Sequence, residues 1–317
     1  MATQQNTKNR NYASVAAIDR FFLLAIYCAV GIFALLVAML FVELVKGSWA
    51  SIVEFGPRFL WSSQWNPVTN EFGALPFIYG TVVSSLIAIL LAGFVGIFAA
   101  AYLAEFAPGW LARPLSFVIE LLAAVPSVVF GLWGLFILAP FVRSTLAPLL
   151  QKTLGFLPIF AGPVLSGTGL LTAGLILALM ILPTVTAISR EVIVAIAQDL
   201  REASMSLGAT KWETVARVVL PASRVGIFGA LVLALGRAIG ETIATTMVIG
   251  NRPEIAVSLF APSYTMASVI ANEFTEANGQ IYIGALLELG LLLFIISFII
   301  NGLARLMLFT VLKGNRA

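Results

Sequence analysis

Residues 202–221 read EASMSLGATKWETVARVVLP, a polar island between two long apolar runs. Ala203, Ser204 and Gly208 have short side chains, which let the backbone of another protein approach closely. Glu202 is expected near the start of a short helix, where a carboxylate interacts favourably with exposed amide dipoles. On composition alone, a solvated connecting loop and a docking loop for a water-soluble partner fit equally well.

The rest of the chain is mostly apolar. Of its 317 residues 60% are hydrophobic and only 10% are charged, which is far from the composition of soluble domains. A helix needs about 20 apolar residues to cross the hydrocarbon core of a membrane. Six stretches qualify: 21–45, 76–103, 115–140, 170–190, 226–249 and 281–305. We therefore predict an all-α polytopic membrane protein with six transmembrane helices.

Six spans place both termini on one side of the membrane, and the basic residues indicate which side. Twelve of the eighteen Lys and Arg residues fall in segments that would be cytoplasmic if the N-terminus is, against five in the external loops. No cleavage site follows the first apolar run, which is too long for a signal peptide. We predict a cytoplasmic tail (1–20), a six-helix permease domain (21–310) with a cytoplasmic loop at about 198–224, and a second cytoplasmic tail (311–317).

The residue types present exclude several kinds of site. The chain has no histidine, which removes histidine-based catalysis, His-ligated metals and His proton relays. Its single cysteine, Cys28, lies in an apolar span and offers neither a disulfide nor metal-ligand spacing. No GxxxxGK[ST] stretch is present to cradle a nucleotide. We predict no enzyme active site, no metal and no bound cofactor in this chain.

The fifth span contains two charges in an apolar setting, Arg237 and Glu241. On a continuous helix the spacing i, i+4 places them one turn apart on one face. One interpretation is a self-satisfied structural ion pair. The other, which we favour, is that Arg237 lines a water-filled pathway and meets an anion there, while Glu241 limits how tightly the anion binds. Gly236 and Gly240 would let a neighbouring helix approach beside them.

Two further features carry expectations about structure. Pro126 should kink the third span, because proline removes a backbone hydrogen bond. Glu288, in the last span, could face the interior of the bundle. The external loop from Gly47 to Leu75 carries Trp49, Trp61 and Trp65, which fit either an interfacial aromatic belt or part of a surface for an extracytoplasmic partner.

Two sequence patterns resemble a known family. Glu202-Ala203-Ser204, three residues, Gly208, nine residues, Val218, one residue and Leu220-Pro221 resembles the EAA loop of bacterial ABC-importer permeases, with Ser and Val in place of Ala and Ile. The hexapeptide RAIGET at 237–242 and the run FGALPFIYGT at 72–81 resemble the Pst phosphate-transport permeases, and among these the C-type subunits.

The resemblance implies a type I ABC-importer permease fold in the bacterial cytoplasmic (inner) membrane. It implies a heterodimer with a sister permease, two cytoplasmic ATPase subunits that bind ATP and Mg²⁺, and an extracytoplasmic phosphate-binding protein. In that family, residues matching Arg237 and Glu241 are associated with phosphate passage. The residues that match the ATPase-docking motif are Glu202, Ala203, Ser204 and Gly208. The chain is thus expected to be a permease subunit working by alternating access.

Other classes of function remain open. In an ion-coupled secondary anion transporter, Arg237, Glu241 and Glu288 would bind substrate and proton in one polypeptide, and no docking loop would be needed. Internal inverted repeats would favour that class, and none is convincing here. The chain could also be an ABC permease for another oxyanion, or a membrane anchor whose charges are incidental. Dependence of uptake on a co-purifying ATPase separates these hypotheses.

Overall fold

The computed structural model describes the backbone of residues 2–314 and the side chains of residues 20–306. The predicted tails at 1–20 and 311–317 lie almost entirely outside the residues whose side chains are described. Within the described residues, six helical stretches are long and apolar enough to cross a membrane, as predicted. They are Arg20–Phe55, Leu75–Phe106, Ser127–Leu154, Leu170–Val194, Lys211–Gly240 and Gln280–Leu306.

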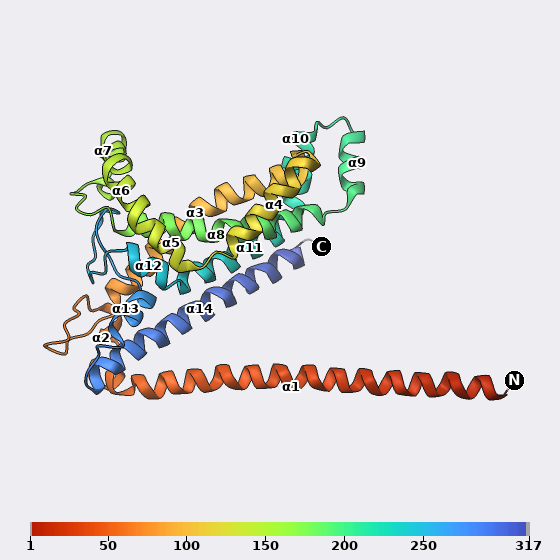
Figure 1. Cartoon of the computed structure of the whole chain (residues 1–317), viewed down its shortest axis with the longest axis horizontal. Helices are drawn as coiled ribbons and strands as arrows, with labels where there is room; N and C mark the ends of the chain where they lie inside the picture. The colour runs from red at the N-terminus through yellow and green to blue at the C-terminus, as the bar shows by residue number, and fades with distance from the viewer. Residues whose placement is uncertain (1, 315–317) are drawn as a thin grey trace.

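Helices make up nearly all of the regular structure (Figure 1). The long ones are α1 (Ala2–Phe55), α3 (Leu75–Ala101), α8 (Leu170–Val194), α11 (Leu220–Gly240) and α14 (Gln280–Gly314). The third span is built from α5 (Ser127–Trp133), α6 (Ala139–Phe141) and α7 (Ala147–Leu154). The others are α2 (Arg58–Trp61), α4 (Gly109–Ala123), α9 (Gln198–Ser206), α10 (Lys211–Thr214), α12 (Ile243–Val248) and α13 (Met266–Glu273).

Wide π-helical turns occur where the helices approach a proline. Within the described residues there are four, and each ends two residues before a proline: Tyr102–Phe106 before Pro108, Gly134–Leu138 before Pro140, Val142–Leu146 before Pro148 and Val215–Val219 before Pro221. In each, the residue before the proline donates its N–H to the carbonyl five residues back. A proline ring clashes with the carbonyl four residues back, so a wider turn accommodates it.

The third span differs from its predicted position at 115–140. The chain does not kink at Pro126 but breaks at residues 124–126, and α5 begins at Ser127. Proline lacks an N–H and biases the preceding residue away from helical geometry, which explains the break. The amphipathic helix α4 therefore stands apart from the third crossing helix. That helix continues to Leu154, beyond the expected end of the span at residue 140.

Small residues bring α3, α8 and α11 together at the centre of the bundle. Ala88 and Ala92 on α3 and Ala234 on α11 are fully buried in one apolar cluster with side chains of α8. A Cβ at Gly174 of α8 would lie 2.5 Å from Cγ2 of Ile87 on α3, so the two backbones approach too closely for any side chain there. Because lipid offers no hydrophobic drive for helix association, such close contact holds these helices together.

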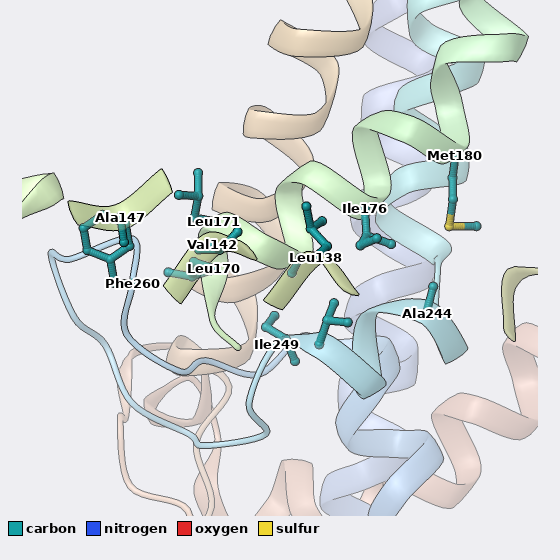
Figure 2. Packing of buried hydrophobic residues seen from close by; sticks show 12 residues of the cluster. Leu138, Val142, Ala147, Leu170, Leu171, Ile176, Met180, Ala244, Ile249 and Phe260 are labelled. Carbon is teal, nitrogen blue, oxygen red and sulfur yellow. The ribbon is translucent and has the colours of Figure 1, made fainter. Parts of the chain in front are cut away.

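One end of the bundle is closed by an apolar cluster that joins four parts of the chain (Figure 2). Leu138 of the third span, Leu170 of α8, Ala244 of α12 and Phe260 of the following loop are all buried in it. The loop also supplies carbonyls to the start of α8: Leu170 N–H donates to Ala261 O at 3.2 Å and Leu171 N–H to Leu259 O at 2.8 Å. These bonds satisfy amides that a helix N-terminus otherwise leaves without partners.

The segment between α1 and α3 packs on the bundle through aromatic rings. Trp65 lies edge-on to Phe72 and Phe77, and its Nε1 donates to Glu273 Oε2 at 2.8 Å. Neighbouring Tyr264 is almost fully buried, and burial raises the pKa of its phenol to about 12. Through its ring contacts and its hydrogen bond to Glu273, Trp65 joins this segment to the bundle. Trp49 and Trp61 are instead exposed.

The first helix stands apart from most of the bundle. The C-terminal end of α1 packs against α14, and there the Ser51 hydroxyl donates to the buried Glu288 at 2.6 Å. Toward the N-terminus of α1 the two helices diverge (Figure 1). Glu288 thus faces another helix of the same chain. Over Arg20–Phe55, the part of α1 whose side chains are described, most of the apolar surface is exposed within this chain.

The contact between α3 and α8 gives the first prediction. Gly174→Ala should destabilise the protein by about 1–3 kcal/mol, because the new methyl group overlaps Ile87 in a packed site. The thermal midpoint of the purified protein should fall, and adding Ile87→Ala should restore part of the loss. Gly31→Ala is the control, since a Cβ at Gly31 meets nothing within 4 Å. An unchanged midpoint for Gly174→Ala would contradict the close approach of these helices.

Candidate functional site

The polar island at 202–221 folds into a helix, a glycine turn and a second helix, in agreement with the expected helix and turn. Ala203 and Ser204 lie on α9, and Gly208 follows it with a φ of +90°. Such a φ favours glycine, because a side chain is strained there. Glu202 is the fifth residue of α9 and not near its start as expected, and Asp199 occupies the first turn.

Capping hydrogen bonds fix the second half of this loop. Thr210 Oγ1 accepts from Glu213 N–H at 3.3 Å, and Glu213 Oε2 accepts from Thr210 N–H at 2.9 Å. This reciprocal capping box starts α10 and satisfies two otherwise free amides. From Lys211 the helix runs through the π-turn before Pro221 into α11. The loop is therefore an ordered extension of the fifth span.

Helix α9 has an inner and an outer face. On the inner face, Ser204 Oγ lies 3.0 Å from Thr214 Oγ1. On the outer face Glu202 and Ala203 are exposed, Leu207 is 89% exposed, and a Cβ at Gly208 would meet nothing within 4 Å. The loop has three further exposed apolar side chains, Leu200, Met205 and Trp212. Of these, Met205 lines a cavity on the bundle side of α9, and the Trp212 ring lies 6.4 Å from that of Phe106. Exposed apolar side chains gathered in a polar loop are typical of an interaction surface.

A groove of about 360 Å³ is lined by residues of both faces of this loop. Ser204, Leu207 and Gly208 form one side, and Arg217, from the π-turn before α11, lines it as well. Of the predicted docking residues, the structure thus brings Ser204 and Gly208 to one concave surface and leaves Glu202 and Ala203 exposed on the helix beside it.

One side chain anchors α9 to the bundle, and the sequence patterns did not identify it. Arg201, on the inner side of α9, makes an ion pair with Glu105 in the π-turn that follows α3, with Nη2 and Oε1 2.7 Å apart. Both side chains are close to 90% buried, at 11% and 10% exposed. Because 96 residues separate the partners, no local spacing could have revealed the pair.

The expected continuous helix around Arg237 and Glu241 is not formed. Helix α11 ends at Gly240, and Glu241, at its C-terminal boundary, has φ −69° and an extended ψ of 125°, so the chain leaves the helix at this residue. Glycine is a poor residue in a helix interior, and Thr242 Oγ1 donates to Gly240 O at 3.2 Å, which favours ending the helix there. The expected continuous span at 226–249 is divided into α11 and α12.

Each charge has its own surroundings. Glu241 Oε1 accepts from Ala244 N–H at 3.3 Å, in the first turn of α12. Arg237 is exposed, and among the side chains described at 20–306 no carboxylate lies within 4.0 Å of it. The expected close approach beside Gly236 is partly present, because a Cβ there would lie 3.8 Å from the Asn301 amide of α14, whereas Gly240 has no such neighbour.

Known proteins with a similar sequence identify the family of this chain. Residues 92–311 match the family described as "Binding-protein-dependent transport system inner membrane component". The phosphate transport system permease protein PstC of Mesorhizobium japonicum is 50% identical over 84% of this chain and 83% of its own length. That of Haemophilus influenzae is 44% identical over 95% of this chain and 96% of its own length.

A solved structure of the MetNI methionine ABC transporter in an inward-facing conformation has the same fold. It superposes with a TM-score of 0.54 over 78% of this chain and 99% of that chain, at 17% sequence identity. The predicted type I importer-permease fold is confirmed. Permease subunits of this family carry no catalytic site and bind no cofactor of their own, in agreement with the prediction.

Such systems work with an ATPase and a binding protein, so partners of both kinds are implied. The long match to both relatives, the family match over more than half of the sequence and the shared fold agree with one another. The chain therefore belongs to the binding-protein-dependent transport system inner membrane components, within the family of PstC-type phosphate transport system permease proteins.

Proposed function

We propose that this chain forms half of the translocation pathway of an ATP-driven phosphate importer and binds a cytoplasmic ATPase through α9 and the Gly208 turn. The main support for this proposal is that the outer face of this loop is ordered, exposed and partly apolar, and that nothing blocks a partner from approaching the Gly208 backbone. The names of the relatives support phosphate as the substrate. The finer assembly that we propose comprises a sister permease, two ATPase subunits and an extracytoplasmic phosphate-binding protein.

We place both termini and α9 in the cytoplasm of a bacterial cell, with the chain in the inner membrane. In Figure 1 the N-terminal end of α1, the C-terminal end of α14 and α9 lie toward the same end of the molecule, while α2, α7 and α13 lie at the other. The excess of Lys and Arg in the segments at the α9 end supports a cytoplasmic position for that end.

For the pathway we propose Arg237 as the group that meets phosphate. A guanidinium binds an oxyanion through two parallel hydrogen bonds, which a compact ammonium cannot reproduce. An unpaired cation in a membrane span is costly unless it faces water or a partner. Because Glu241 lies beyond the end of α11 and bonds α12, neutralisation by that carboxylate does not explain Arg237. Glu241 would instead lie beside the passing anion and limit how tightly it is held.

If the ATPase binds to the outer face of α9, a bulky charged side chain placed there should prevent its binding. In Gly208→Glu and Ala203→Asp variants the ATPase should no longer co-purify and phosphate uptake should be abolished, although the protein still inserts. Gly279→Glu is a matched control, because Gly279 has a φ of +89° and no neighbour within 4 Å of a Cβ. It directly precedes α14, which begins at the end of the molecule opposite α9 (Figure 1). Normal uptake with the ATPase retained in both loop variants would refute the docking assignment.

The orientation predicts which positions a membrane-impermeant thiol reagent can reach. In a Cys28→Ala background, Ser63→Cys should be labelled in intact cells, whereas Ser206→Cys should be labelled only after permeabilisation. Both serines are exposed, so access depends on the side of the membrane. Labelling of the Ser206 position in intact cells would overturn the orientation.

The pathway assignment predicts the behaviour of three Arg237 variants. Arg237→Lys and Arg237→Gln should lose most phosphate uptake while membrane abundance stays normal, because the planar fork is gone. The double variant Arg237→Gln/Glu241→Gln should remain inactive, since nothing is left to hold the anion. Uptake and abundance should be measured together for all three. Recovered uptake in the double variant would show a structural ion pair instead of a phosphate contact.

A further inference from the structure

The position of α9 does not depend on an apolar core. None of its residues, Gln198–Ser206, is buried. Beneath it lies a cavity of about 610 Å³, lined on the bundle side by Ala104 and Val194 and on the loop side by Met205 and Lys211. A helix that lies above a cavity needs polar contacts to hold it in place. Most of the hydrogen bonds between α9 and the bundle come from Arg201.

Arg201 connects three parts of the chain through one guanidinium. Its Nε and Nη2 donate to Glu105 Oε1 at 3.0 and 2.7 Å, which ties α9 to the end of α3. Its Nη2 also donates to Ile193 O at 2.8 Å, and its Nη1 donates to Ile196 O. These carbonyls belong to the last turn of α8 and the residues just after it, where a helix leaves acceptors without partners and favours a cation.

The geometry of this contact makes it stiff. The guanidinium is planar with its donors in a fixed fork, so three partners at once define the orientation of α9 closely. Both charged groups are about nine-tenths buried, so the loss of either one would leave the other poorly solvated. By contrast, the Lys46–Glu43 ion pair is largely exposed and joins neighbouring turns of one helix.

We propose that Arg201 and Glu105 are positioning residues that transmit the movement of α9 to α3 and α8. The inference rests on the proposed docking of an ATPase to α9. The outer face of α9 would take up the displacement imposed by ATP binding and hydrolysis, and Arg201 on the inner side passes it to the two helices that pack most closely at the centre of the bundle. Without this ion pair, α9 itself is held by the chain at residues 195–197, by the Ser204–Thr214 hydrogen bond and by the chain that leads into α11.

If the proposal is right, removing the Arg201–Glu105 ion pair separates ATP hydrolysis from phosphate transport while the complex stays assembled. Neither side chain lies on the outer face of α9, so removal of the pair should leave the ATPase bound and hydrolysing ATP while phosphate transported per ATP falls. A role limited to folding would instead lower assembly, hydrolysis and uptake in parallel. The ratio of phosphate transported to ATP hydrolysed therefore distinguishes transmission from general structural support.

The test uses the intact importer complex in proteoliposomes, with the variants Glu105→Gln, Arg201→Gln, Arg201→Lys and the double Gln variant. Phosphate uptake, ATP hydrolysis and ATPase co-purification are measured on the same preparations. The transport ratio should fall about tenfold in Arg201→Gln, within the range that coupling mutations reach. Arg201→Lys should not restore it, because one ammonium cannot serve the three partners. The double variant should lose no more than the worse single one, since both act through one contact.

Glu105→Gln keeps the size and acceptor oxygen of the side chain, so it addresses coupling even if the Arg201 variants fold poorly. Lys46→Gln is the control, because it breaks an exposed ion pair far from α9 and should leave the ratio unchanged. An unchanged ratio in Glu105→Gln and Arg201→Gln, a parallel fall of hydrolysis and uptake, or loss of the ATPase would each overturn the proposal. If the unmodified complex shows no ATP-dependent phosphate uptake, the proposed function itself fails.

Discussion

The hydrocarbon interior of a membrane offers no hydrogen-bond partners, so every backbone N–H and C=O within it must be satisfied by the protein. This constraint explains the irregular features of the chain. Prolines at 108, 140, 148 and 221 are each preceded by a π-turn whose i to i−5 bond keeps the helix hydrogen-bonded up to the proline. At Pro140, Pro148 and Pro221 the helix is thereby widened instead of broken, whereas at Pro108 it ends. Pro221 is the point where the loop at 202–221 passes into α11.

The same constraint positions both ends of α8. At its start, carbonyls of Leu259 and Ala261 accept from the free amides and hold the loop at 259–261 against the bundle. At its end, Arg201 donates to the carbonyls of Ile193 and Ile196 and holds α9 against it. Helix α8, packed on α3 through small residues, thus connects the loop at 259–261 with the proposed ATPase-docking loop. In this arrangement a displacement at one end of α8 has a short, rigid route to the other.

Local patterns in the sequence predicted what depends on local chemistry. Hydrophobic length gave six crossing helices, and small residues with Gly208 gave a helix and turn at the docking loop. Features that depend on tertiary contacts were missed. The end of α11 at Gly240 interrupts the span that was expected to continue through Glu241, and the break before Ser127 moved the third span toward Leu154. The Glu105–Arg201 pair joins residues 96 positions apart and leaves no trace in local spacing.

The central claim is that ATP, hydrolysed by a partner bound to α9, drives phosphate through a pathway that this chain helps to form. The most direct measurement is the uptake of labelled phosphate into proteoliposomes that contain the complete importer, with ATP supplied on the side that carries α9. The account predicts uptake that requires ATP on that side, persists when ion gradients are dissipated and is not competed by sulfate. Uptake driven by an ion gradient without ATP would contradict it.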